Sequence, residues 1–147
     1  MKFDREIVEE YWRKATKQWQ SKLEKVCRFY GATYVDRLII DVLSKHESIN
    51  KKVIAAELCT ESQNLTRSLT RLVAANLITC INLEKDNRYR VYSLTEKGYE
   101  LAHKISKANN NIWDTALSGI DNNDLIGFQN CFIAMSKNID KSIKKKS

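Results

Sequence analysis

The chain has 147 residues, 43% of them hydrophobic, which is enough for one domain with a core and excludes a disordered chain. Lys and Arg number 25 against 18 acidic residues, so the net charge is +7 and the isoelectric point is near 9.2, which favours a polyanionic partner such as nucleic acid. Pro is absent and Gly occurs four times, which favours long helices over a turn-rich β architecture.

Targeting and cofactor signals are missing from the sequence. No apolar stretch of about 18 residues occurs, and Lys2, Asp4, Arg5 and Glu6 make the N-terminus charged from the start. The sequence therefore predicts neither a membrane span nor a secretory signal, and hence a cytoplasmic protein. The cysteines, at positions 27, 59, 80 and 131, have no C-x-x-C spacing, so free thiols are expected. His46 and His103 are too few and too far apart to propose a metal site, and no cofactor is expected.

The first predicted helix runs from Asp4 to about Tyr30 and ends near Gly31, a natural C-terminal cap. Its apolar residues recur every three or four positions, at Val8, Trp12, Ala15, Trp19, Leu23, Val26 and Tyr30. Such a long apolar stripe exceeds what a small domain can cover. We therefore expect it to pack on other helices of the same chain or on a second copy.

Two shorter helices follow. Thr33 can cap a second helix that has Asp36 at its third position and ends near His46. Ile49 is expected to be a strand residue that pairs with a later hairpin, and Asn50 is expected to cap a third helix. With the next helix, this third helix forms a predicted helix-turn-helix.

The next helix has a polar face of unusual chemistry. Thr60 and Gln63 fit a capping box, so this helix is expected to begin near Glu61. At 100° per residue one side is apolar, with Leu65, Leu69, Leu72 and Val73, and the other carries Gln63, Asn64, Arg67, Thr70 and Arg71. Asn and Gln match adenine, and Arg matches guanine or phosphate, so this face suits a DNA groove. An ordinary amphipathic helix facing water is the alternative.

The rest of the chain predicts a hairpin and two helices. Residues 77–84 and 89–94 have strand character, and residues 85–87 have turn chemistry. Thr95 then caps a helix to about Ala116, which residues 109–111 weaken, and a last helix starts near Asn123. The predicted fold class is mostly α with a small β-hairpin wing (α+β), a winged helix-turn-helix.

Residues 86–98, which read D-N-R-Y-R-V-Y-S-L-T-E-K-G, and the segments Leu65-Thr66-Arg67, Arg71-Leu72 and Asn76-Leu77-Ile78 carry a resemblance to a known family. From residue 33 to residue 98 the chain resembles the multiple-antibiotic-resistance regulator (MarR) family of winged-helix transcription factors. The resemblance implies that Arg88 enters a minor groove, braced by Asp86, and that helix residues line a major groove. With the neighbouring polar residues, the predicted DNA-binding set is Ser62, Gln63, Asn64, Thr66, Arg67, Thr70, Arg71, Asp86, Arg88 and Arg90.

Three positions depart from the family pattern. Cys59 stands where a Gly is usual in the turn before the recognition helix, and Asn76 stands where a Gly is usual at its end. Glu61 replaces a capping Ser, and its charge would repel phosphates although a helix N-terminus favours it. The turn before the recognition helix is therefore the segment where a different structure is expected.

The predicted organisation is a single domain, residues 1–147, with a DNA-binding head at 33–98 and a helical dimerisation lobe from residues 1–31 and 99–147. A dimer places two heads on half-sites about one DNA turn apart, so the expected partner is double-stranded DNA with a pseudo-palindromic operator. The alternative is that the terminal helices only close the core of a monomer.

The predicted function is a homodimeric, sequence-specific transcriptional regulator acting as a repressor. Enzymatic motifs such as G-x-x-x-x-G-K and H-E-x-x-H are absent, so an enzyme is not expected. The alternative is a winged-helix module that binds protein instead of DNA, which Glu61 and Glu84 favour and which the arginines of the predicted DNA-binding set disfavour.

Family members respond to small aromatic ligands or to oxidants, and the resemblance implies candidates for both. A pocket for a small aromatic effector would draw on Trp12, Trp19, Tyr30, Tyr34 and Trp113, although core or dimer packing is the simpler explanation of each of them. Cys27 and Cys59 are the redox candidates, and inert thiols are the alternative, because no neighbouring His or paired Cys in the sequence favours a thiolate.

Overall fold

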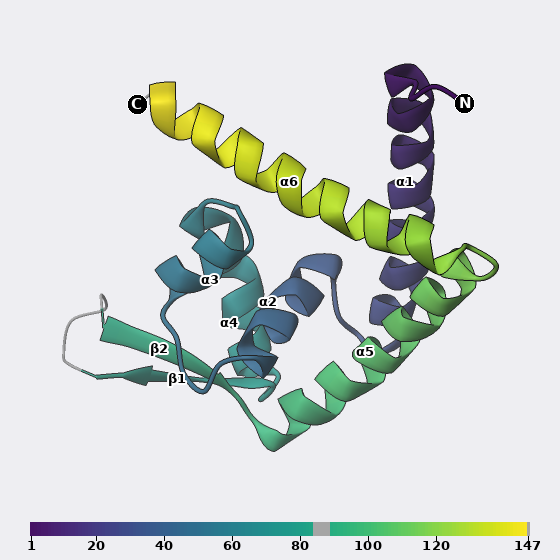
Figure 1. Cartoon of the computed structure of the whole chain (residues 1–147). Helices are drawn as coiled ribbons and strands as arrows, with labels where there is room; N and C mark the ends of the chain where they lie inside the picture. Colours follow the sequence, from purple (N-terminus) through teal and green to yellow (C-terminus); the bar gives the residue numbers. More distant parts are fainter. Residues whose placement is uncertain (84–88, 147) are drawn as a thin grey trace. The chain divides into compact units, whose positions relative to one another are not determined.

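The computed structural model of the chain describes residues 1–83 and 89–146 (Figure 1). The predicted fold class is confirmed, because the chain is mostly helical and has one antiparallel hairpin. It divides into two compact units, Met1–Ile112 and Trp113–Ser147. The elements in chain order are α1 (Arg5–Phe29), α2 (Tyr34–Ser44), α3 (Lys51–Glu57), a 3₁₀ turn η1 (Ser62–Leu65), α4 (Thr66–Ala74), β1 (Ile78–Asn82), β2 (Arg90–Leu94), α5 (Glu96–Leu117) and α6 (Asn122–Lys146).

Side-chain caps begin several helices, as the sequence predicts. Thr33 and Asp36 form a reciprocal capping box at the start of α2. The carboxamide oxygen of Asn50 accepts the Val53 amide at 2.9 Å, and the Thr95 hydroxyl accepts the Gly98 amide at 3.0 Å. Each cap supplies an acceptor to a helix N-terminus whose first amides lack intrahelical partners.

Left-handed residues follow the ends of α1, α3 and α4. Gly31, Cys59 and Asn76 have φ values of 75°, 53° and 58°. In each case the following amide bonds back to a carbonyl of the last turn; the Thr60 amide donates to the Ala55 carbonyl at 3.0 Å. This is the Schellman arrangement, for which glycine is the usual residue. Cys59 and Asn76 therefore adopt the conformation of the family's glycines, and Asn tolerates it better than Cys.

The capping box expected at Thr60 is wrong. The Thr60 amide is already used to close α3, and its hydroxyl oxygen accepts from the side-chain amide of Asn64 at 3.1 Å. Glu61 precedes the first turn without a side-chain cap. The predicted single helix from Glu61 is consequently a 3₁₀ turn, η1, followed by α4.

The core of the first unit lies between α2, α3, α4 and the hairpin. The predicted apolar side of α4 is confirmed, because Leu65, Leu69 and Leu72 are at most 3% exposed. They belong to a cluster of buried side chains that also contains Leu23, Cys27, Ile39, Ile40, Leu43, Ile54, Ile78 and Ile105. Burial of that side fixes which side of α4 faces outward.

The hairpin pairs β1 with β2 in antiparallel register, from Ile78 opposite Leu94 to Asn82 opposite Arg90. Ile49 adds a bridge to Tyr92, as predicted, with backbone N···O distances of 3.2 and 2.8 Å. The turn expected at residues 85–87 lies outside the described residues. The hairpin is thus tied to the segment between α2 and α3, which leads into α3.

The long helices differ in how much they bury. The second half of α1 contributes Leu23 and Cys27 to the core, whereas Tyr11 and Trp12 in its first half are 59% and 47% exposed. Helix α5 is continuous through residues 109–111, and the indole N–H of Trp19 donates to the side-chain oxygen of Asn109 at 3.1 Å. In the second unit, α6 exposes Phe128 and Ile139.

Over residues 1–83 and 89–146, none of the helices combines the length and apolarity that crossing a bilayer requires.

Candidate nucleic-acid interface

A polar face covers the outward side of η1 and α4. It consists of Ser62, Gln63, Asn64, Thr66, Arg67 and Thr70, of which all but the half-buried Ser62 are exposed. The opposite side consists of Leu65, Leu69 and Leu72, which are buried in the core. The polar face therefore has to face solvent. Six of the ten predicted DNA-binding residues therefore lie together on one solvent-facing surface.

Neighbouring groups hold part of the polar face in place. The Lys51 ammonium at the start of α3 donates to the Thr66 hydroxyl at 2.6 Å, and the Thr70 hydroxyl donates to the Thr66 carbonyl at 2.9 Å. Over residues 1–83 and 89–146, the side chains of Gln63 and Arg67 make no hydrogen bond or ion pair with one another or with any other residue. These two side chains have their donors available for a ligand, and both match base edges.

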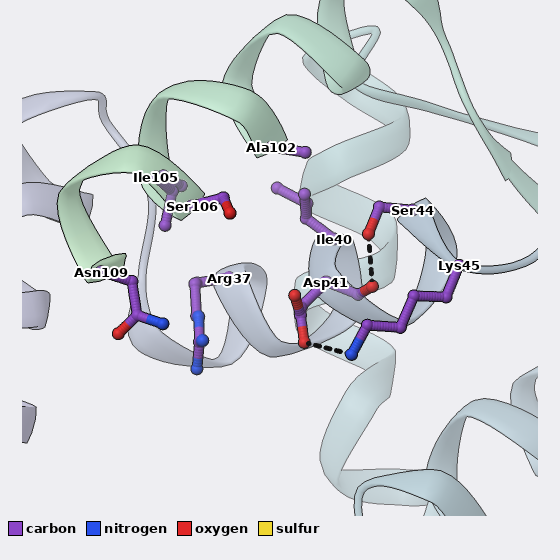
Figure 2. Close-up of a pocket in the computed structure, with 9 residues that line it drawn as sticks. All are labelled: Arg37, Ile40, Asp41, Ser44, Lys45, Ala102, Ile105, Ser106 and Asn109. Carbon is purple, nitrogen blue, oxygen red and sulfur yellow. Dashed lines mark hydrogen bonds and ion pairs between the residues drawn. The ribbon is translucent and has the colours of Figure 1, made fainter. Parts of the chain in front are cut away.

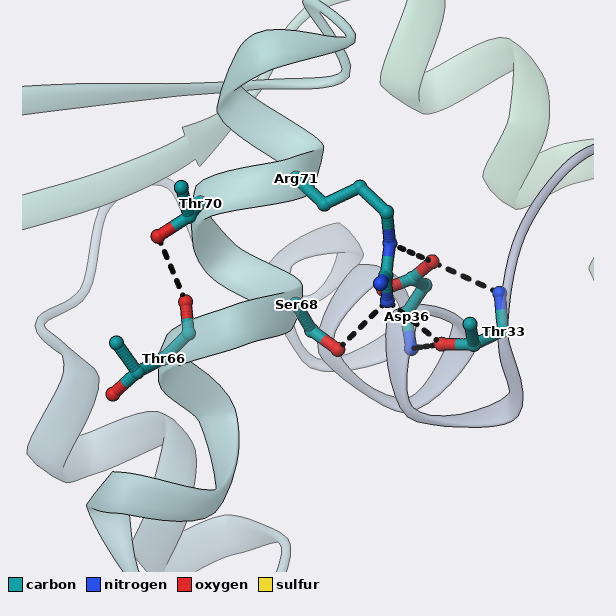
Figure 3. Close-up of polar contacts among 6 residues, drawn as sticks. All are labelled: Thr33, Asp36, Thr66, Ser68, Thr70 and Arg71. Carbon is teal, nitrogen blue, oxygen red and sulfur yellow. Dashed lines mark hydrogen bonds and ion pairs between the residues drawn. The ribbon is translucent and has the colours of Figure 1, made fainter.

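Arg71 has a different environment from the polar face. Its guanidinium pairs with the carboxylate of Asp36 on α2, with an Nη2···Oδ1 distance of 2.7 Å. Figure 3 shows Arg71 reaching toward α2, while Thr66 and Thr70 lie on another side of α4. Helical periodicity predicted Arg71 on the DNA-facing side of the helix. It could not reveal the partner Asp36, which lies 35 residues away in the sequence.

The wing carries the remaining predicted residues. Arg90 is exposed at the start of β2, opposite Asn82. Asp86 and Arg88 lie outside the described residues. Glu61, the acidic departure from the family pattern, is exposed directly before the polar face.

A second polar contact joins the loop after α2 to α3, because His46 Nε2 lies 2.7 Å from the Glu57 carboxylate. The sequence signal for this pair is weak, since eleven positions separate the two residues and neither lies on the polar face. The Asp36–Arg71 pair thus ties α2 to α4, and the His46–Glu57 contact ties the loop after α2 to α3.

The five predicted pocket aromatics do not form one cluster in the first unit. Trp19 and Tyr34 meet edge to face, with ring centroids 6.3 Å apart. Tyr30 instead contacts Phe29 at 5.0 Å and the Lys104 ammonium at 5.7 Å. Trp12 borders a shallow hollow of about 360 Å³ on the surface of α1, and Trp113 belongs to the second unit.

A more enclosed cavity of about 180 Å³ lies between α2 and α5 (Figure 2). Arg37 and Asn109 stand at one end, and Asp41 pairs with Lys45 at the other, at 3.4 Å. Its lining residues are Arg37, Ile40, Asp41, Ser44, Lys45, Ala102, Ile105, Ser106 and Asn109. Trp19 adjoins this cavity, since the Arg37 guanidinium lies 5.6 Å from its ring and its indole N–H binds Asn109.

The two redox candidates differ in accessibility. Cys27 is fully buried, and this burial raises the pKa of its thiol, which keeps it protonated and unreactive. Cys59 is exposed in the left-handed turn before η1. The structure therefore favours the inert alternative for Cys27 and leaves Cys59 as the accessible thiol of the two.

Comparison with known proteins defines the class of this site. Residues 33–98 match the model of the winged helix DNA-binding domain, and they include α2, α3, α4 and the hairpin strands. The head is therefore a winged-helix domain of the DNA-binding class.

Similar whole proteins narrow the class. The chain is 24% identical over 132 residues to the HTH-type transcriptional regulator SarZ of Staphylococcus epidermidis, covering 89% of this chain and 88% of that protein. A MarR transcriptional regulator from Methanosarcina mazei superposes with a TM-score of 0.80 at 21% identity, over 92% of this chain and 98% of that one. BpsR of Bordetella bronchiseptica, whose DNA binding is described as regulated by 6-hydroxynicotinic acid, superposes with a TM-score of 0.77 at 15% identity, over 88% and 98%. Residues 33–98 thus form a winged helix DNA-binding domain, and the chain as a whole is similar to transcriptional regulators.

Proposed function

We propose that the protein is a homodimeric, sequence-specific repressor that reads DNA with the polar face of η1 and α4. The observation that carries this proposal is the pair of exposed, uncommitted side chains Gln63 and Arg67 on a helix whose other side is buried. Arg67 fits the O6 and N7 acceptors of guanine, and Gln63 fits adenine. A regulator of this kind acts in the cytoplasm.

The wing completes the proposed surface. Arg90 lies at its base, and the family resemblance supports Arg88 in the minor groove with Asp86 beside it. The net charge of +7 supports binding to the phosphate backbone. Lys51, which holds Thr66, adds positive charge next to the polar face.

The exposed apolar residues of the long helices support dimerisation. Ile7, Val8 and Tyr11 on α1 are 55%, 43% and 59% exposed, and Phe128 and Ile139 on α6 are 50% and 58% exposed. Large apolar side chains exposed along a helix often belong to an interface. A second copy of the chain covers them, and two heads then address two half-sites.

Salt dependence distinguishes this function from that of a protein-binding module. Purified protein is used to select a duplex from a random pool, and fluorescence polarisation then measures the affinity as salt is raised. Each phosphate contact adds about −0.9 to the slope of log affinity against log salt, so about six contacts cost roughly three orders of magnitude over a fourfold rise. Absent or salt-insensitive binding would favour the protein module.

We also propose that a small aromatic acid is the effector and binds in the cavity between α2 and α5. Arg37 supplies a cation, Asn109 and Ser106 supply hydrogen bonds, and Ile40 and Ile105 supply apolar wall. A volume near 180 Å³ is below the roughly 300–1,000 Å³ typical of drug-sized ligands, so a single-ring compound fits best. The regulation of the similar protein BpsR by 6-hydroxynicotinic acid supports this class.

Thermal denaturation tests the effector proposal with salicylate and 6-hydroxynicotinic acid as probes. At a ligand concentration of about 100 Kd the melting temperature should rise by roughly 9 °C, because the ligand binds only the folded chain. Arg37→Gln should abolish the rise, whereas Arg28→Gln, an exposed site at the end of α1, should retain it. An equal rise in both variants, or no rise in the natural protein across a panel of aromatic acids, would contradict the site.

A further inference from the structure

The side chain of Asp36, at the start of α2, is only 2% exposed and meets the guanidinium of Arg71 on α4. The contact is two-pronged: Arg71 Nη2 donates to Oδ1 at 2.7 Å and Arg71 Nε donates to Oδ2 at 3.2 Å. Fork geometry of this kind fixes both distance and orientation, which a single hydrogen bond does not. The recognition helix α4 is thus joined at one residue to the first turn of α2.

Hydrogen bonds with Thr33 also hold the Asp36 carboxylate in place, independently of Arg71. Its Oδ2 accepts the Thr33 amide at 2.9 Å, and the Thr33 hydroxyl in turn accepts the Asp36 amide at 3.0 Å. Arg71 Nη2 also donates to the Thr33 hydroxyl and to the Ser68 hydroxyl, both at 3.2 Å. The capping box of α2 is therefore an anchor for the guanidinium as well as a helix start (Figure 3).

The guanidinium is committed to this anchor. The side chain of Arg71 remains 42% exposed, but its Nε and Nη2 groups are engaged with α2 and Ser68. Hydrogen bonding to Asp36 also raises the pKa of Arg71. Moving Arg71 onto a phosphate would leave a buried carboxylate without its counter-charge, which is strongly unfavourable.

We infer that Asp36 is a positioning residue for DNA recognition: through Arg71 it sets the orientation of α4, and Arg71 itself does not contact DNA. This inference rests on the proposed DNA-binding function. It assigns Arg71 a role different from that of Arg67, which lies one helical turn earlier and makes no ion pair with any of residues 1–83 and 89–146.

Four variants of the full chain test the inference with the selected duplex. Asp36→Asn removes the buried charge, Arg71→Gln removes its partner, their combination removes both, and Arg71→Lys keeps the charge without the fork. Each single change should weaken DNA binding by about three- to thirtyfold, the range expected when an orienting contact away from the ligand is lost. The combined variant should bind no more weakly than the weaker single variant. All four should keep the natural salt slope, because no phosphate contact is lost.

A direct contact between Arg71 and DNA gives opposite results. Asp36→Asn would then leave affinity unchanged or raise it, because a carboxylate that competes for Arg71 is removed. Arg71→Gln would make the salt slope shallower by about 0.9 for each phosphate lost. Arg71→Lys would bind nearly as well as the natural protein. Any of these results would overturn the inference.

Hydrogen exchange in the DNA-free protein gives a readout that does not depend on the proposed function. The amides of α4 should exchange faster in Asp36→Asn and Arg71→Lys than in the natural chain. Glu47→Gln, which removes an exposed acid from the loop between α2 and α3, is the matched control and should change neither exchange nor affinity. Unchanged exchange of α4 in both test variants would contradict the inference even if no duplex were bound. If Asp36→Asn fails to fold, Arg71→Lys and the combined variant decide the outcome.

Discussion

Replacing Gly98 by alanine should lower the free energy of unfolding by about 3 kcal/mol, at the upper end of the range for overpacked cores. Gly98 lies buried in the first turn of α5, and a Cβ there would stand 2.1 Å from the Leu77 carbonyl oxygen and 3.0 Å from Leu94 Cδ2. The carbonyl cannot simply move away, because it accepts hydrogen bonds from the Thr95 amide and hydroxyl, both at 3.1 Å. The helix start would have to shift instead.

The matched control is Gly127→Ala in α6, where an added Cβ meets no atom within 4 Å. This change should stabilise the chain by up to about 1 kcal/mol, since Gly is a poor helix former. Thermal or urea denaturation followed by tryptophan fluorescence measures both changes, and Gly98→Ala should lower the melting temperature by roughly 10 °C. Equal stability of the two variants would show that α5 does not approach Leu77 so closely.

Replacing Arg67 by alanine should cost about 1–3 kcal/mol of DNA-binding free energy, roughly a tenfold to hundredfold loss of affinity. Arg67 is exposed on the polar face and has no partner among residues 1–83 and 89–146, so the variant should fold normally. The loss should be larger on the selected duplex than on random-sequence DNA, because a base contact carries sequence information and a phosphate contact does not.

Fluorescence polarisation with both duplexes measures this effect. Arg28→Ala, which removes the same charge from the exposed end of α1, is the control and should retain most of the affinity. Equal losses in the two variants would mean that only the overall charge matters. If Arg67→Ala binds the selected duplex as tightly as the natural protein does, the polar face is not the DNA-binding surface.

Local patterns predicted most of the head because the physical causes are local. The three-four spacing of Leu65, Leu69 and Leu72 identified the buried side of α4, and all three side chains are buried. Thr33 and Asn50 were recognised as caps because each needs only a side-chain oxygen next to a helix start. The strand character of residues 89–94 likewise predicted β2, and the expected pairing of Ile49 with the hairpin is confirmed.

The errors came from competition between neighbours and from long-range pairing. Thr60 has the right spacing to Gln63 for a capping box, but its amide is already used in closing α3 through the left-handed Cys59. The position of Arg71 on a helical wheel gives its direction but not its partner, since Asp36 becomes its neighbour only when α2 and α4 pack. Spacing along the chain likewise does not show which rings meet, such as Trp19 and Tyr34.

The central claim is that two copies of the chain place their polar faces on one duplex. Hydroxyl-radical footprinting of the selected duplex with purified protein tests it most directly. A dimer that binds in this way should protect two segments of the duplex that are related by a two-fold axis. Their centres should lie about one helical turn, or roughly 10 base pairs, apart. A single protected segment, or none at salt concentrations that permit binding, would contradict it.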